Sequence, residues 1–178
     1  HTPLFLVSGG SSSLVESLVD GVTLADLRTL NERGLAAGLS IEELNRERAR
    51  LSRLKAGGVA RLLGTRRALA LFVSDVRTDD PAVIGSGLLG PSPGHRDAIE
   101  RVVVASIDDA VAAAAESAQH QGLSLAVLEG RFAGDVTAIA GEFLRALRDC
   151  EGDGVIWGGE STVVLPDNPG RGGRNQHL

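Results

Sequence analysis

The chain has 178 residues, 43% hydrophobic and 23% charged, which is enough for one or two small globular domains with a real core. A net charge of −5 argues against a surface that binds nucleic acid or anionic membranes, and no apolar run is long enough to span a bilayer. The single cysteine, Cys150, excludes an internal disulfide framework and a cysteine-built zinc site, and it predicts a soluble protein of the reducing cytoplasm.

The first predicted strand is the apolar run Pro3–Val7, followed at once by Ser8–Ser13 (SGGSSS) and an apolar-periodic stretch at Leu14–Val19. Two helices are then predicted from capping boxes, the first at Thr23 with Asp26 and the second at Ser40 with Glu43. The second helix spans Ile41 to about Leu54 and ends at the run KAGG, where glycine permits a left-handed turn.

The rest of the chain alternates apolar strands with helices, the pattern of an α/β fold. The predicted elements are strands at 68–73, 101–105, 123–128, 154–157 and 161–165, helices at 107–121 (capped by Ser106 and Asp109) and 136–148 (capped by Asp135), and a loop at 166–173. A polar segment at Asp79–Gly94 predicts a boundary between residues 1–90 and a βαβ lobe at 91–178. Because there is no methionine and the first residues run straight into a strand, we expect an excised piece of a longer protein.

Three glycine-bearing turns follow apolar strands, at residues 8–13, 158–161 and 170–175. Ligands of parallel α/β sheets bind at the carboxyl ends of strands, although a single glycine turn is equally explained by steric need. Ser8–Ser13 stands out, because two glycines and four hydroxyls form a cradle suited to a carboxylate or phosphate. Neither the P-loop pattern nor the dinucleotide fingerprint is present, which disfavours both of those classes.

Charged residues near these turns are candidates for catalysis or for binding an anionic ligand. Lys55 is the only lysine among 18 basic residues, so it is either a point charge for an anion or an exposed residue at a helix end. Asp75 follows a buried strand, where it is either a catalytic or metal-binding carboxylate or a turn cap. Glu160 is expected to face a cation, and the guanidinium of Arg174 to bind an anion.

Five motifs in order resemble the type-2 glycerate kinases, which are often described as hydroxypyruvate reductases. They are FLVSGGSSSL (5–14), SIEELNRERARLSRLKAGG (40–58), FVSDVRTDDPAVIGSG (72–87), GGESTVV (158–164) and GRGGRNQHL (170–178). The resemblance implies a Rossmann-like, largely parallel sheet with flanking helices, plus part of a second, smaller α/β domain. It also implies transfer of a phosphoryl group from ATP, with Mg²⁺, to the 2-hydroxyl of D-glycerate, giving 2-phosphoglycerate.

Carried over by position, the resemblance implies catalytic roles for Lys55, Asp75 and Arg174, with Asp75 also the candidate metal ligand. The residues implied to bind substrate or phosphate are Ser8, Gly9, Gly10, Ser11, Ser12, Arg48, Gly158, Gly159, Glu160, Gly172, Gly173 and Asn175. The expected partner is D-glycerate, without nucleic acid or membrane, and a homodimer is a candidate assembly.

This sequence also departs from the family pattern. Arg50, Ser11 and His177 stand where the family has His, Gly and Glu, and both the family's Gly-Lys-Ala-Ala segment and its acidic C-terminal glycine run are absent. The chain is therefore expected to be incomplete as a catalyst. The alternatives are an NAD(P)H-dependent hydroxypyruvate reductase, which needs the missing fingerprint, and a non-catalytic module that binds an organic anion.

Overall fold

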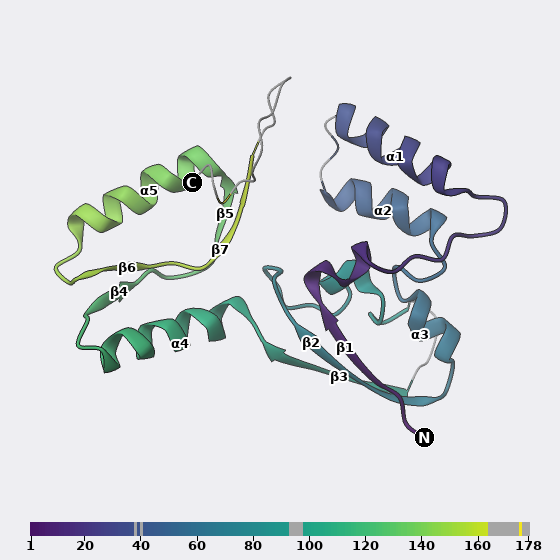
Figure 1. Ribbon diagram of the computed structural model, residues 1–178, viewed down its shortest axis with the longest axis horizontal. Helices are drawn as coiled ribbons and strands as arrows, with labels where there is room; N and C mark the ends of the chain where they lie inside the picture. The colour runs from purple at the N-terminus through teal and green to yellow at the C-terminus, as the bar shows by residue number, and fades with distance from the viewer. Residues whose placement is uncertain (38, 40, 93–97, 164–174, 176–178) are drawn as a thin grey trace. The chain divides into compact units, whose positions relative to one another are not determined.

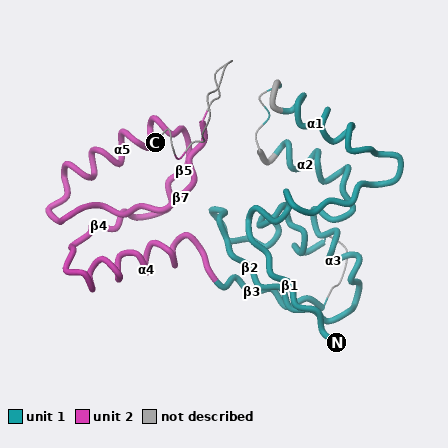
Figure 2. Tube along the Cα trace, viewed as in Figure 1, with its two compact units in different colours: residues 1–104 teal, residues 105–178 magenta. Residues whose placement is uncertain are grey.

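The computed structural model describes residues 1–37, 39, 41–92, 98–163 and 175 (Figure 1). The chain divides into two compact units, His1–Val104 and Ala105–Leu178 (Figure 2). The division falls later than the boundary expected after residue 90, because strand β3 (Ala98–Ala105) remains in the sheet of the first unit.

The first unit is built on a three-stranded sheet in the order β1-β2-β3. Its elements are β1 (Leu4–Ser8), the 3₁₀ helix η1 (Gly9–Ser13), α1 (Leu24–Ala36), α2 (Ile41–Leu51), α3 (Gly58–Leu63), β2 (Arg67–Val73), the 3₁₀ turn η2 (Ile84–Gly87) and β3. Strands β1 and β2 run parallel, with Leu4 opposite Leu69 and Ser8 opposite Val73. Their carboxyl ends therefore lie together at one edge of the sheet.

The core of the first unit lies on one face of this sheet. Alternate residues of β2 point into it, so Ala68, Ala70 and Phe72 are buried, and α3 packs there through Ala60. On the opposite face, Leu6 of β1 is 76% exposed.

Helices α1 and α2 lie side by side (Figure 1). The capping box at Thr23 and Asp26 is confirmed, since the Asp26 carboxylate accepts hydrogen bonds from the Thr23 backbone N–H and hydroxyl, which lower the Asp26 pKa. Ser40 lies outside the described residues. Helix α2 ends at Leu51 rather than near Leu54, because the segment that follows pairs with residues 17–19 through an antiparallel bridge between Leu18 and Ser52. That pairing also explains why no helix forms at 14–19.

The second unit contains two parallel strand pairs, β4-β6 and β5-β7. Its elements are α4 (Ile107–His120), β4 (Leu125–Val127), β5 (Phe132–Asp135), α5 (Val136–Asp149), β6 (Gly154–Ile156) and β7 (Gly159–Thr162). The predicted caps are confirmed: Ser106 and Asp109 form a capping box at α4, and Asp135 accepts the Thr137 N–H at α5. Parallel strand pairs with flanking helices confirm the α/β fold class.

Candidate functional site

A compact serine turn follows β1 directly, at the carboxyl edge of the sheet. Gly9–Ser13 forms η1, and the Ser11 hydroxyl accepts a hydrogen bond from the Ser8 backbone N–H at 2.9 Å. The Ser13 hydroxyl donates back to the Gly10 carbonyl at 2.8 Å. Because these bonds are internal to the turn, they shape it without fixing it to the rest of the unit.

Lys55 lies against this turn and is 5% exposed. Its Nζ donates to the Ser12 carbonyl at 2.9 Å and forms an ion pair with Glu16 Oε2 at 3.1 Å. The alternative of an exposed lysine at a helix end is therefore wrong. Lys55 and the turn therefore lie in contact, whereas Arg174, which we also expected beside them, lies outside the described residues.

The carboxylate of Glu16 is surrounded by donors. Besides Lys55, it accepts the Ser52 hydroxyl at 2.6 Å and the Ser17 backbone N–H at 2.9 Å. Burial acts to raise the pKa of Glu16, but the hydrogen bonds from Ser52 and Lys55 outweigh it and the pKa is lowered. Glu16 is therefore ionised at neutral pH, as an ion pair with Lys55 requires.

The η2 turn supports the serine turn from another side. The Ser86 hydroxyl donates to the Ser12 hydroxyl at 2.9 Å. Ser86 has a φ of 56°, a left-handed conformation that a residue with a side chain adopts only where the surrounding contacts stabilise it. Its carbonyl accepts the Ala56 N–H at 3.0 Å, and the next bonds in the ladder join Gly57 N–H to Gly87 O at 2.7 Å and Val59 N–H to Leu88 O at 3.1 Å.

Asp75 completes the group at this edge. It lies two residues beyond β2, beside Gly9, and a Cβ built on Gly9 would overlap the Asp75 carboxylate. The absence of a side chain at Gly9 is what allows this carboxylate to approach the serine turn. Asp75 is exposed, so it is accessible to a ligand at the turn.

The other expected site residues belong to other elements of the two units. Arg48 of α2 donates from Nε to Asn31 of α1 at 2.7 Å and from a terminal nitrogen to Asn45 at 3.2 Å, so it joins the helix pair. Glu160 is an exposed residue of β7 in the second unit, opposite Ala133 of β5. Gly158 packs against Ile107 and Val111, and Gly159 against Phe132. Gly172, Gly173 and Arg174 lie outside the described residues, and Asn175 is exposed.

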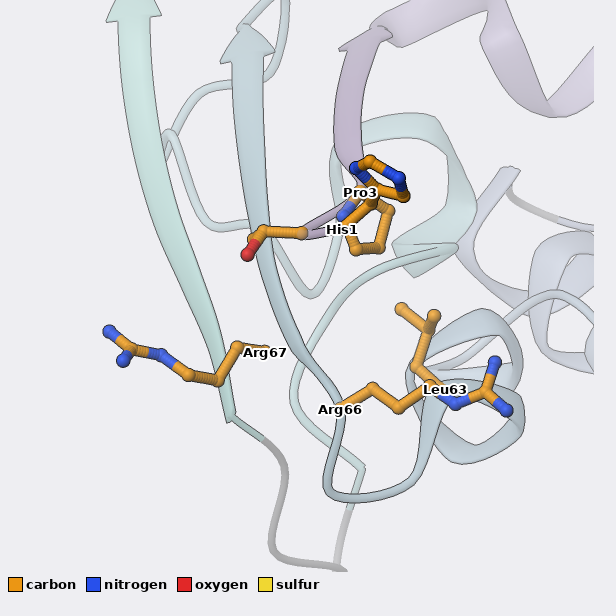
Figure 3. A pocket seen from close by; sticks show the side chains of 6 residues that line it. His1, Pro3, Leu63, Arg66 and Arg67 are labelled. Atoms are coloured by element: carbon orange, nitrogen blue, oxygen red, sulfur yellow. The ribbon is translucent and has the colours of Figure 1, made fainter.

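A hollow lies at the other end of the strands, where β1 and β2 begin (Figure 3). It is lined by His1, Thr2, Pro3, Leu63, Arg66 and Arg67. Ligands of parallel α/β sheets bind at the carboxyl ends, so the serine turn is the better candidate. Within the described part of the chain, no three His, Cys, Asp or Glu side chains cluster as metal ligands, and no helix has the length and apolarity to cross a membrane.

Sequence reasoning missed Glu16, Ser52 and Ser86. Glu16 has no local signal, because its side-chain partners, Ser52 and Lys55, are distant in the chain. Ser52 stands three residues before Lys55, a spacing that lets a side chain bond the backbone ahead of it, and its hydroxyl accepts the Lys55 N–H at 3.1 Å. That spacing is a signal that could have been found.

The lowered pKa of Glu16 predicts a pH dependence of stability. A carboxyl whose pKa is lower in the folded than in the unfolded chain stabilises the fold above its usual pKa of 4.5, and this is lost as the pH falls through the folded value. We expect wild type to exceed Glu16→Gln in free energy of unfolding at about pH 7 and to lose that advantage towards about pH 3. Urea denaturation of both proteins across this pH range measures the difference in free energy of unfolding. A difference that does not change with pH would contradict the prediction.

A parallel α/β sheet with a serine–glycine turn, a carboxylate and a buried, ion-paired lysine at its carboxyl edge is typical of α/β proteins that bind small anionic molecules. Residues 1–120 match a family described as "Domain of unknown function (DUF4147)". The chain is 30% identical to the D-glycerate 2-kinase of Thermotoga maritima, over 99% of this chain and 51% of the relative. It is 32% identical to a putative hydroxypyruvate reductase of Agrobacterium vitis, over 97% of this chain and 56% of the relative.

Among solved structures, the glycerate kinase of Thermotoga maritima matches with a TM-score of 0.76 at 28% identity, over 98% of this chain and 51% of that one. The chain therefore belongs to the DUF4147 family and is a homologue of the glycerate 2-kinases. It spans about half the length of the curated relatives it matches. The Agrobacterium alignment runs over 215 residues, so the relative has residues inside the matched region that this 178-residue chain lacks.

Proposed function

We propose that the protein phosphorylates the 2-hydroxyl of D-glycerate with ATP, forming 2-phosphoglycerate. The observation that carries this proposal is the convergence of the Ser8–Ser13 turn, Lys55 and Asp75 at one sheet edge. The names of the relatives, D-glycerate 2-kinase and glycerate kinase, support the substrate class. Because the chain spans about half of those relatives, its residues supply one part of the complete site.

In the proposed reaction, the 2-hydroxyl oxygen of glycerate bonds to the γ-phosphorus of ATP, and the bond from that phosphorus to the β,γ-bridging oxygen breaks. ADP leaves, and the hydroxyl proton passes to the carboxylate of Asp75. Phosphoryl transfer asks the protein mainly to position its reactants and to stabilise charge. The turn's peptide N–H groups and hydroxyls would orient the anionic substrate beside Asp75.

Mg²⁺ fits this chemistry, since it is usually bound by one or two carboxylates together with the phosphates of the substrate, where it neutralises negative charge. Asp75 is the exposed carboxylate beside the turn, so it is the residue that would hold the ion if the proton is taken by another group. The absence of a three-residue ligand cluster among the described residues is compatible with such a site.

The test is an activity assay of the full-length gene product with D-glycerate, ATP and Mg²⁺. The product is passed to enolase, which accepts 2-phosphoglycerate and not the 3-phosphate. We expect enolase-dependent turnover without added mutase. Turnover only with mutase would place the phosphate on the 3-hydroxyl, oxidation of NADH with hydroxypyruvate would support the reductase, and glycerate binding without turnover would support a binding module.

A further inference from the structure

Ser12 is fixed at two points by segments distant in the chain. Its carbonyl accepts the Lys55 ammonium and its hydroxyl accepts the Ser86 hydroxyl, across 43 and 74 residues of sequence. The remaining side-chain hydrogen bonds of the turn, Ser8 to Ser11 and Ser13 to Gly10, are local. Beyond Ser8, which is paired with Val73 in the sheet, the turn is therefore held to the rest of the unit by these two anchors.

The charge of Lys55 is already neutralised inside the protein. Its ammonium is 5% exposed and paired with Glu16, whose carboxylate also accepts from Ser52. An anionic ligand that approached Lys55 directly would have to compete with the Glu16 carboxylate at 3.1 Å. Lys55 is thus better placed to act on the turn than on the substrate.

We propose that Glu16 and Lys55 are positioning residues: their ion pair, together with the hydrogen bond from Ser86 to Ser12, sets the position of the Ser8–Ser13 turn for ligand binding. Glu16 orients the ammonium, and the ammonium binds the Ser12 carbonyl. The proposal rests on the proposed function only in that it takes the turn as the ligand-binding element.

The experiment compares Lys55→Met, Glu16→Gln and the double variant by amide hydrogen exchange. Two protected amides report on the turn, those of Ser8 and Leu14, which donate to the Ser11 hydroxyl and carbonyl. The amides of β2 report on the sheet. Each variant should raise exchange in the turn about tenfold relative to β2, and the double variant should exceed neither single, since the pair acts as a unit.

Arg53→Ala is the matched control. Arg53 stands two residues before Lys55 and forms an ion pair with Asp20, but its side chain is 45% exposed. Removing this exposed pair should leave exchange in the turn unchanged. Lys55→Arg retains the charge and should show a smaller rise than Lys55→Met, and Ser86→Ala tests the second anchor without leaving a buried charge, in case Lys55→Met fails to fold.

Kinetics separate positioning from chemistry. In the glycerate-dependent assay, we expect Lys55→Met and Glu16→Gln to raise KM for glycerate about tenfold and to change kcat by less than about threefold. A large fall in kcat with normal exchange in the turn would overturn the proposal, as would equal acceleration of exchange in the turn and β2. If wild type shows no glycerate turnover, the proposed function fails while the exchange data still decide the positioning role.

Discussion

Gly87→Ala is expected to destabilise the first unit by about 3 kcal/mol. Gly87 has a φ of +65°, which a residue with a Cβ adopts at a cost of about 1–2 kcal/mol. The added Cβ would also overlap the backbone carbonyl of Ala82, which cannot rotate away as a side chain would. The strain and the clash add, because both arise from the same methyl group in a closely packed turn. Urea denaturation of the variant and wild type measures the loss.

Gly21→Ala is the matched control for this substitution. Gly21 has a φ of +80°, and a Cβ built there meets nothing within 4 Å. It should lose only the conformational part, about 1 kcal/mol. Equal losses for the two variants would show that the η2 turn can move away from Ala82, and would contradict the close packing described above.

Gly9→Ala is expected to lower glycerate-dependent turnover about a hundredfold while changing stability little. The new Cβ overlaps the Asp75 carboxylate, which is exposed and can rotate towards solvent. Rotation relieves the clash at low cost to the fold, but it removes the carboxylate from the turn. The variant should therefore resemble Asp75→Asn in kcat, and the two changes together should be no worse than either alone.

Gly10→Ala tests whether any added side chain in the turn lowers turnover, or only one that displaces the Asp75 carboxylate. A Cβ on Gly10 meets nothing within 4 Å, so turnover should stay within about threefold of wild type. If Gly10→Ala is as damaging as Gly9→Ala, the turn itself and not the position of Asp75 controls the reaction. If neither variant affects turnover, Asp75 has no part in it.

Elements with local signals could be predicted from the sequence. Helices α4 and α5 begin where Ser106 and Asp135 cap them, because a cap is a contact between near neighbours in the chain. Strand β2 is marked by an unbroken apolar run. By contrast, α3 has six residues and begins with a glycine, and β5 (FAGD) has no alternation, so both depend on packing and pairing with distant segments.

The candidate site was predictable in part for the same reason. The serine turn and Asp75 each follow a recognisable strand, and parallel pairing of those strands brings them to one edge. The partners of Lys55 and Ser12 could not be inferred, because Glu16 and Ser86 come from segments whose approach only the folded chain determines. The sequence marked Lys55 as unusual without indicating whether it faces a ligand or another part of the protein.

The ladder of backbone bonds between residues 56–59 and 86–88 limits how this family can change in length. The three bonds join residues 56, 57 and 59 to residues 86, 87 and 88, so one residue inserted within either segment would displace the pairs that follow it. Insertions that distinguish longer homologues from this chain should therefore accumulate in other connections. In homologous sequences, the segments that carry these bonds should therefore keep a constant length, because they connect Lys55 and Ser86, which both contact the serine turn.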